Sequence, residues 1–150
     1  MGERVVVPAL KAAGIHRLDA LIISHGDNDH AGGAYSVWMN TPIAIAYTSD
    51  VPKLTKLVPH LPWCACMAQQ AWQWDNVHFQ FLNPPANDLQ KGNDQSCVLK
   101  ISNAHQQILL TGDIEKSSEQ NLLRENAALL ASTLLVAPHH GSKTSSTQAF

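Results

Sequence analysis

Residues 18–33 read LDALIISHGDNDHAGG and decide the fold prediction. The first seven residues form a short, mainly apolar run that includes the β-branched residues Ile22 and Ile23. Such a run is typical of a strand covered on both faces. Directly after them come His25, Asp27, Asp29 and His30, four potential metal ligands within six residues. Aspartate is rarely buried without a partner, so this density of ligands predicts a metal site at the strand end. The alternative is a solvated turn, rich in Asp and Asn, that happens to contain histidines.

Two later turns also carry potential ligands after apolar strands. Residues 107–111, QILLT, lead into Gly112-Asp113, and residues 133–138, TLLVAP, lead into His139-His140. Open α/β sheets build their sites from loops at strand ends that meet at one edge. Either turn alone fits an ordinary turn or a surface histidine pair. Taken together, the three turns favour a metal centre.

The whole chain reads as an α/β domain spanning residues 1–150. Predicted strands alternate with helices or loops, as in a layered α/β domain. We expect strands over residues 18–24, 42–47, 77–82, 97–102 and 106–110, and a polar loop over 84–92. We expect a helix over residues 8–13, a second that runs through Trp38 and Met39, and a third over residues 50–61. A fourth helix should begin at Ser117 or Ser118, which would cap it, and end at about residue 128. An apolar fraction of 45% suits a globular domain, and no apolar stretch is long enough to span a membrane.

These motifs resemble the metallo-β-lactamase fold, whose signature is His-x-His-x-Asp-His followed by a distant His, an Asp after a strand and a last His. More narrowly, the chain resembles the C-terminal metallo-β-lactamase-like domain of the ComEC/Rec2 competence proteins, which take up DNA through the inner membrane. The resemblance rests on GIHRLDA (14–20), the ligand loop (24–33), WQWDNVHF (72–79), NDQSCVL (93–99), LTGDIE (110–115) and APHHGSKTSS (137–146). It implies an αββα sandwich. In the family this fold starts before and ends after the matching region, so we expect a soluble fragment of a larger protein, incomplete at both ends.

The resemblance also implies a ligand set. His25 and Asp27 would belong to the first metal, Asp29 and His30 to the second, and Asp113 would bridge the two. Asp29 would also orient the attacking water, so Asp29 and Asp113 are the expected catalytic residues. Alignment to different branches of the superfamily selects either His139 or His140 as the last ligand, and we favour His140.

Two departures from the superfamily pattern alter the expected metal. Asp27 stands where a second histidine is usual, and Asn93-Asp94 stands where a further histidine would be. Carboxylates are harder donors than imidazole, which moves the preference away from zinc alone. We therefore expect one or two divalent ions, Mn²⁺ or Zn²⁺, with Mg²⁺ as a further candidate.

The hydroxyl-rich segment after the histidine pair is a candidate for phosphate binding. Such a segment is often only a flexible loop, but its place beside a ligand favours a phosphate cradle. The net charge is −2 and the basic residues are scattered, so no basic stripe for nucleic acid is present. The candidate substrate-binding residues are Ser142, Lys143, Thr144, Ser145 and Ser146, together with Asn93 and Ser96.

From the resemblance we predict a metal-dependent hydrolase, more narrowly a phosphodiesterase or nuclease that acts on DNA during DNA uptake. The expected form of the substrate is single-stranded DNA. Its partner would be the channel of the same parent protein in the inner membrane. The resemblance does not say on which side of that membrane this domain lies. No nucleotide cofactor is expected. One alternative is a hydrolase of small esters or phosphoesters on the same fold, since fold does not fix function. Another is a non-catalytic metal-stabilised module of a DNA-uptake channel.

The cysteines and tryptophans give weaker signals. Cys-x-Cys at Cys64 and Cys66 lacks the second pair that a structural zinc site needs. We expect Cys66 and Cys97 to be small buried side chains without a redox role. The tryptophans at positions 63, 72 and 74 could stack on bases, but core packing is the more common use of such residues.

Overall fold

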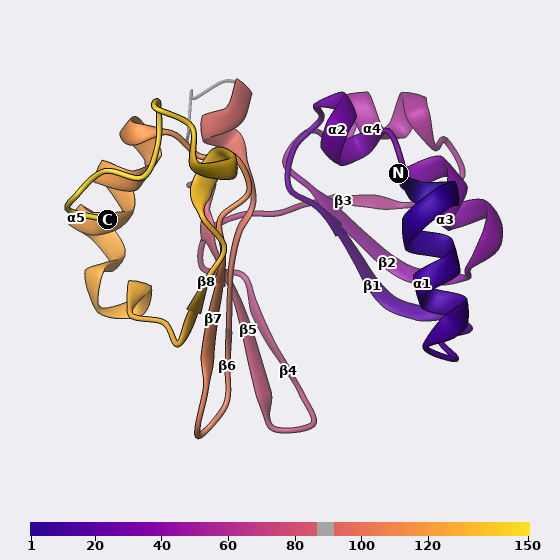
Figure 1. Cartoon of the computed structure of the whole chain (residues 1–150), viewed down its shortest axis with the longest axis horizontal. Coiled ribbons are helices and arrows are strands. Elements are labelled where there is room, and N and C mark those ends of the chain that lie inside the picture. The colour runs from indigo at the N-terminus through magenta and orange to yellow at the C-terminus, as the bar shows by residue number, and fades with distance from the viewer. Residues whose placement is uncertain (87–91) are drawn as a thin grey trace. The chain divides into compact units, whose positions relative to one another are not determined.

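A computed structural model describes residues 1–86 and 92–150 of the chain. It consists of two compact units, Met1–Ala65 and Cys66–Phe150. Each unit has its own sheet (Figure 1). Each unit also has its own apolar core. Most of the polar loop predicted for residues 84–92 lies outside the described residues. That residues 1–150 form one domain stays a prediction.

Unit 1 is a parallel three-stranded sheet with helical crossovers. The sheet order is β1-β2-β3, with β1 at Leu18–Ile23, β2 at Ile43–Thr48 and β3 at Trp63–Ala65. The helical segments are η1 (Gly2–Val6), α1 (Val7–Ala12), α2 (Asn28–Ala31), α3 (Ala34–Asn40) and α4 (Val51–Leu57). Parallel neighbours need crossover connections, and α2 with α3, then α4, supply them. The core contains Ala31, Ala34, Ala46, Leu54, Val58 and Leu61.

Helix α4 begins where Asp50 caps it. The Asp50 side chain accepts a hydrogen bond from the Lys53 N–H at 3.0 Å, and Pro52 occupies the first turn, where its missing N–H costs nothing. The helix spans only Val51–Leu57, so it is shorter than the predicted range of 50–61. The α4 N-terminus therefore has a fixed place beside the end of β1, which matters for the ligand turn below.

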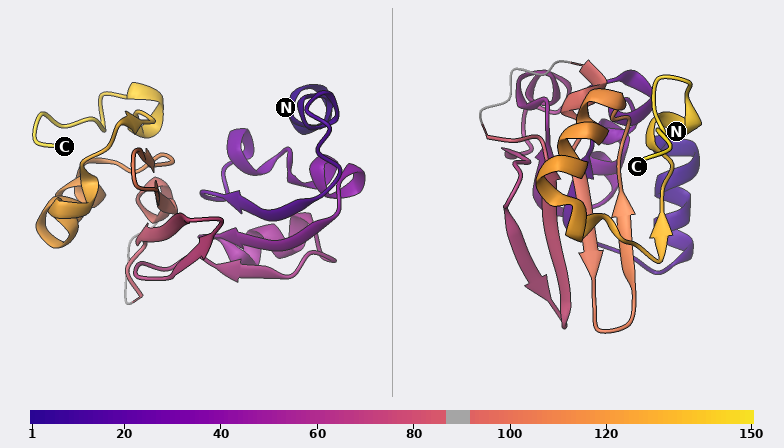
Figure 2. Two further views of the ribbon diagram at one scale, coloured as in Figure 1. Left: turned by 90° about the horizontal axis from the view of Figure 1, so that it is seen from below. Right: turned by 90° about the vertical axis from the view of Figure 1, so that its left-hand side faces the viewer.

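Unit 2 is a five-stranded sheet with one long helix. The strands are β4 (Ala71–Trp74), β5 (Val77–Asn83), β6 (Val98–Ser102), β7 (Gln107–Leu110) and β8 (Leu134–Leu135), in that order across the sheet. Neighbours are antiparallel except β7 and β8, which are parallel. Helix α5 (Lys116–Leu130) covers one face of this sheet (Figure 2). The strands predicted over 97–102 and 106–110 are present as β6 and β7, and they pair as a hairpin with Ser102 opposite Gln107. The core contains Leu82, Val98, Leu109, Ile114 and Leu122.

The cap of α5 differs from the sequence prediction. Neither Ser117 nor Ser118 is the N-cap residue, because the helix begins after Glu115. The capping carboxylate comes instead from Asp94, in the short 3₁₀ helix η2 (Gly92–Gln95). Asp94 accepts hydrogen bonds from the Glu115 N–H at 2.8 Å, the Ser118 N–H at 3.3 Å and the Ser117 hydroxyl at 2.6 Å. A side chain far away in the sequence thus satisfies the first turn of the helix.

Cys66 and Cys97 form a disulfide, so the expectation that they are merely small buried side chains is wrong. They are buried as expected, at 1% and 3% exposure. The missed signal is pairing between cysteines 31 residues apart, which spacing alone cannot show. Cys64 remains a free, exposed thiol.

The tryptophans divide between packing and exposure. Trp72 stacks on Phe79 across the β4–β5 hairpin, with ring centroids 5.2 Å apart, as the packing prediction requires. Trp74 is 41% exposed, so the prediction of core packing is wrong for that residue. Its position on an edge strand of the sheet leaves part of the ring in solvent.

Candidate metal-binding turns

The unit 1 ligand turn, residues 24–30, joins β1 to α2. The Ser24 hydroxyl oxygen lies 3.1 Å from Nδ1 of His25 and 3.2 Å from Nδ1 of His30. The two ring centroids are 4.3 Å apart. One hydroxyl oxygen can accept from both ring N–H groups, because it has two lone pairs. In that arrangement both Nε2 atoms keep the lone pair that a metal needs.

Each Nε2 atom of this turn faces a carboxylate. His25 Nε2 lies 3.6 Å from Asp27 Oδ2, and His30 Nε2 lies 3.6 Å from Asp29 Oδ2. These separations exceed the usual range of an N–H···O hydrogen bond, about 2.7–3.2 Å. They fit two donors that share a cation at about 2.0–2.2 Å from each. The donor set and its spacing therefore suit a divalent metal ion.

The turn rests directly on the start of α4. A Cβ added to Gly26 would lie 2.5 Å from Asp50 Oδ2 and 2.7 Å from Lys53 Cδ, so a larger residue would have to displace these two side chains. The Ser49 hydroxyl also donates to the Ser24 carbonyl at 2.9 Å. Lys53 Nζ lies 3.7 Å from Asp27 Oδ1, which gives Asp27 a cationic neighbour within the protein. The glycine of the motif thus serves close packing of the loop.

A cavity of about 270 Å³ borders the same turn. Asp29 and His30 line it together with apolar side chains that include Leu21 and Ile23. The polar edge of this cavity is therefore made by two predicted ligands, and its wall is apolar.

The unit 2 ligand turns are residues 112–115, after β7, and residues 138–141, which form the 3₁₀ segment η3 after β8. Asp113 is 5% exposed, and its backbone N–H donates to the Ser96 hydroxyl oxygen at 3.1 Å. Its Oδ2 atom lies 3.5 Å from Nε2 of His140 and 4.0 Å from Nε2 of His139. Two imidazoles thus converge on one buried carboxylate, again at a spacing that a cation could bridge.

The histidine pair has an unusual backbone. His139 and His140 have φ angles of 46° and 53°, and Gly141 has a φ angle of 76°. A left-handed conformation costs a non-glycine residue roughly 1–2 kcal/mol, so two in succession need support. The His139 N–H donates to the Gly112 carbonyl at 3.1 Å, and the Ser142 N–H donates to the His139 carbonyl at 2.8 Å. Strain that is held in this way is typical of functional sites.

Two glutamates that the sequence analysis missed support these turns. Glu115 Oε1 lies 3.2 Å from Nδ1 of His139 and accepts a hydrogen bond from the Thr144 hydroxyl at 2.9 Å. Glu119 is fully buried, and its carboxylate accepts the backbone N–H groups of Ser146 and Thr147. In the sequence, Glu119 appears only as an acidic residue near a helix start. No local pattern showed that it holds a distant loop.

The predicted substrate-binding residues are largely occupied within the protein. Ser96 is fully buried against Asp113, and the Asn93 amide donates to Glu115 at 3.5 Å. The Ser145 hydroxyl donates to the carbonyls of residues 138 and 142, at 2.8 and 3.1 Å. We now expect Ser96 and Ser145 to hold the turns in place. Among this group Lys143, Thr144 and Ser146 are exposed, and contact between these residues and a substrate stays a prediction.

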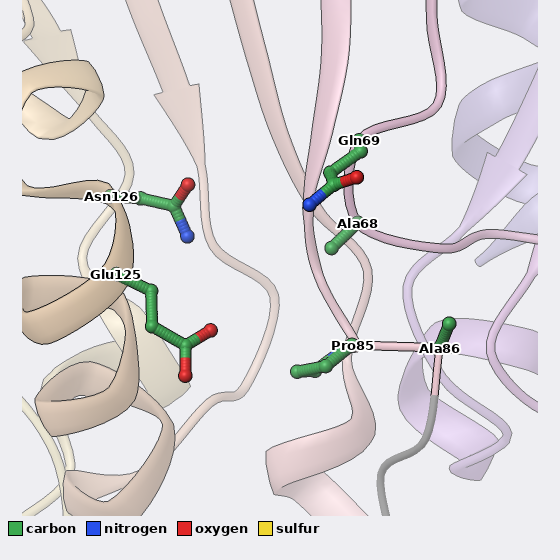
Figure 3. Close-up of a pocket in the computed structure, with 6 residues that line it drawn as sticks. All are labelled: Ala68, Gln69, Pro85, Ala86, Glu125 and Asn126. Atoms are coloured by element: carbon green, nitrogen blue, oxygen red, sulfur yellow. The ribbon is translucent and has the colours of Figure 1, made fainter.

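The predicted ligands divide between the two units. Asp29 and His30 in unit 1, and Asp113 and His140 in unit 2, are candidate metal ligands on the geometry of their side chains. Unit 2 also has a separate cavity of about 190 Å³, shown in Figure 3. Ala68, Gln69, Pro85, Ala86, Glu125 and Asn126 line it, and none of them is a predicted site residue. No helix among the described residues is long and apolar enough to cross a membrane.

The chain is similar to the metallo-beta-lactamase superfamily and to part of several competence and recombination proteins. Residues 2–150 match the family model described as the metallo-beta-lactamase superfamily. The chain is 39% identical to competence protein ComA of Neisseria gonorrhoeae over 145 residues, which is 97% of this chain and 20% of that protein. It is 34% identical to recombination protein 2 of Haemophilus influenzae, over 99% of this chain and 18% of that protein. It is 32% identical to ComE operon protein 3 of Bacillus subtilis, over 100% of this chain and 20% of that protein. The chain thus spans about a fifth of the length of these curated relatives.

Solved structures with low sequence identity share the fold. CmlA, a diiron beta-hydroxylase from Streptomyces venezuelae, matches with a TM-score of 0.59 and 9% identity, over 81% of this chain and 25% of CmlA. A metallo-beta-lactamase from Cronobacter sakazakii matches with a TM-score of 0.59 and 15% identity, over 91% of this chain and 64% of that one. The predicted fold and the predicted resemblance are both confirmed.

Proposed function

We propose that this chain, which belongs to the metallo-beta-lactamase superfamily, is a metal-dependent phosphodiesterase that hydrolyses DNA. The observation that carries the proposal is the donor geometry of the two sets of turns. In each of them imidazole Nε2 atoms lie 3.5–4.0 Å from carboxylate oxygens, a spacing that suits divalent cations. The names of the similar proteins, two of which are competence or recombination proteins, support DNA as the substrate.

The proposed ligands lie in both units. We assign His25, Asp27, Asp29 and His30 to metal binding in unit 1, and Asp113 and one histidine of the 139–140 pair to metal binding in unit 2. Three of the six proposed donors, Asp27, Asp29 and Asp113, are carboxylates. A carboxylate-rich set favours Mn²⁺ or Mg²⁺ relative to a set made of histidines alone. Zn²⁺ remains a candidate.

The chain's own residues would bind and orient the substrate. When bound, a divalent ion neutralises charge on the phosphate and lowers the pKa of a coordinated water. Asp29 would accept a hydrogen bond from the attacking water and direct it toward phosphorus. Lys143 and Ser146 would contact phosphate oxygens. The net charge of −2 gives no basic stripe, so binding should be weak and salt-sensitive.

A second candidate is a non-catalytic metal-stabilised module of a DNA-uptake channel. The observation that favours it is the Lys53–Asp27 pair at 3.7 Å, because a lysine beside a ligand competes with a metal for that carboxylate. The replacement of superfamily histidines by Asp27 and Asn93 points in the same direction. In this case the metal would stabilise the fold without supporting turnover.

Cleavage of DNA with Mn²⁺ present separates these candidates. We expect both single- and double-stranded DNA to be cut without strong sequence preference, because no residue here is placed to read base edges. The control is Asp113→Ala, which removes a proposed metal ligand of unit 2. A small phosphodiester such as bis(p-nitrophenyl) phosphate distinguishes a general phosphoester hydrolase. Equal background cleavage by the wild-type chain and Asp113→Ala would favour the non-catalytic module.

The Cys66–Cys97 disulfide supports a location for this activity. We propose that the parent protein lies in the inner membrane and that this domain acts beside the channel of that protein. Disulfides persist in oxidising compartments and are rare in the cytosol, so the pair favours the outer side of that membrane. The exposed thiol of Cys64 provides a reporter. A membrane-impermeant maleimide should label Cys64 in cells with a permeabilised outer envelope and intact inner membrane, whereas labelling only after lysis would contradict this location.

A further inference from the structure

Three aromatic rings of unit 1 form one continuous group. Helix α3, in the helical layer of that unit (Figure 1), carries Tyr35, Trp38 and Met39. The ring centroids of Tyr35 and Trp38 are 5.7 Å apart. Trp38 also stacks on His60, which follows α4, with centroids 5.8 Å apart and an interplanar angle of 25°. Met39 lies one helical turn from Tyr35 and borders the same group. These four side chains are called the α3 aromatic surface below.

The outer members of the α3 aromatic surface are open to solvent. Tyr35 is 48% exposed, Met39 is 57% exposed, and His60 is exposed as well. Trp38 is half-buried and packs against the core of unit 1, so it gives the outer rings a fixed base. A single exposed apolar side chain is ordinary, but several in contact mark an interaction site.

The surroundings of this surface contain little negative charge. Between residues 31 and 65 the only carboxylate is that of Asp50, which caps α4. Lys56, in the last turn of α4, is exposed and lies close in the chain to His60. Proteins that bind single-stranded nucleic acid combine exposed rings, on which bases stack, with cations that meet the phosphates. The α3 aromatic surface and Lys56 provide both.

A lipid surface is the other class of partner that exposed aromatic side chains can meet. Helices that lie on membranes carry many lysines and arginines along their polar face. Helix α3 has no charged residue, and three of the four side chains of the surface are rings. Both features favour flat bases over lipid.

Another side of α3 borders the ligand turn of unit 1. Ala34 and Val37 of this helix line the cavity that Asp29 and His30 also line. Because Tyr35 directly follows Ala34, the aromatic surface begins beside the wall of that cavity. A DNA strand held on this surface would therefore lie close to the candidate ligands of unit 1.

We propose that the α3 aromatic surface binds the bases of single-stranded DNA, and so supplies affinity that the scattered basic residues do not. The inference rests on the proposed function, since it adds a binding surface for the same substrate. It also narrows that substrate, because the bases of a duplex are already stacked on one another and cannot use the rings. The tryptophans considered for base stacking in the sequence are different ones, since only the fold brings His60 beside α3.

Fluorescence anisotropy of a labelled oligothymidylate tests the surface apart from the metal sites, when the whole chain is titrated without divalent ions. Tyr35→Ala should weaken binding about tenfold or more, the loss expected when one base loses its stacking ring. Tyr35→Phe should bind as the wild type does, because it keeps an aromatic face. Trp74→Ala is the matched control, since it removes a ring of similar exposure, 41%, in unit 2. A duplex of the same length should bind more weakly and should not respond to Tyr35→Ala.

The salt dependence of the same binding tests the part played by Lys56. Lys56→Gln should reduce the slope of log Kd against log salt concentration by about 0.7, the share of one phosphate contact with a single strand. Lys11→Gln, which changes an exposed lysine of α1, is the control and should keep the wild-type slope.

Three results would overturn the inference. They are a wild-type chain that does not bind oligothymidylate, a Tyr35→Ala chain that binds it as tightly as the wild type, and Tyr35-dependent binding to phosphatidylglycerol vesicles without binding to oligothymidylate. Cleavage with Mn²⁺ present separates this inference from the proposed function. Cleavage of oligothymidylate that is equal in wild type and Tyr35→Ala would reject the surface alone. Tyr35-dependent binding without any cleavage would reject the proposed hydrolysis and leave the surface standing.

Discussion

The ligand turns of the two units are built in different ways. In unit 1, four candidate ligands lie within six consecutive residues, and Ser24, the residue just before them, bonds both imidazoles. In unit 2, the ligands come from two turns, and Ser96, Glu115 and Glu119 hold those turns from other segments. The first arrangement depends on local sequence. The second depends on tertiary structure, so it should respond more strongly to changes at distant positions.

Loss of the disulfide should have the largest effect. Cys97 follows Ser96, which bonds the Asp113 backbone, so the disulfide anchors the segment behind that ligand. For a loop closed by cysteines 31 residues apart, the chain-entropy estimate is about 3–4 kcal/mol of stability. We expect Cys66→Ser to lower the free energy of unfolding by about that amount in urea denaturation. Cys64→Ser is the matched control, and a reducing agent should bring the wild-type chain to the level of Cys66→Ser. A variant as stable as the control would show that the disulfide does not hold this unit.

Removal of the buried glutamate comes next. Glu119→Ala leaves the N–H groups of Ser146 and Thr147 without their carboxylate acceptor. Hydrogen bonds to a charged group contribute about 1.5–3 kcal/mol, so the free energy of unfolding should fall by roughly 2 kcal/mol. The free energy of unfolding of Glu119→Gln should lie between those of the wild type and Glu119→Ala, because the glutamine amide has a single acceptor oxygen. Hydrogen exchange should show the loss of protection at residues 146 and 147. Unchanged protection there would contradict the role assigned to Glu119.

Replacement of Ser24 should disturb the unit 1 turn with a smaller change in stability. Ser24→Ala removes the hydroxyl that bonds both His25 and His30, so the rings lose their common support. We expect Mn²⁺ affinity to fall about tenfold, as for other partners of metal-binding histidines. The free energy of unfolding should change by no more than about 1 kcal/mol. Ser36→Ala, in α3, is the control, and equal affinities of the two variants would contradict the role of Ser24.

The smallest effect concerns Lys100, a buried residue of β6. Its ammonium group donates to the Ala131 carbonyl and, at 3.2 Å, to the Ser132 hydroxyl near the end of α5. Burial lowers the pKa of Lys100 below its ordinary value. The folded chain therefore loses this proton at a lower pH than the unfolded chain does, and stability rises with pH across that window. The difference in unfolding free energy between wild type and Lys100→Met should rise toward pH of about 10.4 and then level off. Since Tyr47 is present in both chains, its raised pKa cancels in the difference.

The sequence predicted the local features of the molecule well. A contiguous motif after an apolar run predicted β1 and the candidate ligands of unit 1, and the strands that form the β6–β7 hairpin were predicted as well. The family resemblance gave the fold. These signals are local because the residues involved are neighbours in the chain.

The sequence could not predict the supports of unit 2. The Cys66–Cys97 pairing, the capping of α5 by Asp94, and the contacts of Glu115 and Glu119 all join residues far apart in the chain. Nothing in their spacing marks these partners, because tertiary structure alone brings them together. Where a local rule was applied, as in choosing Ser117 or Ser118 as the cap of α5, a distant carboxylate took that place.

The proposal that the ligand turns bind divalent metal ions is tested most directly by thermal unfolding with added Mn²⁺. A cation that binds only the folded chain stabilises it by mass action, by about 2.7 kcal/mol at a hundredfold excess over Kd. The melting temperature of the wild-type chain should therefore rise with Mn²⁺ concentration. The rise should disappear both in Asp29→Ala with His30→Ala and in Asp113→Ala. A wild-type melting temperature that stays constant across titrations of Mn²⁺, Zn²⁺ and Mg²⁺, or a rise that survives in both variants, would contradict the proposed metal centre.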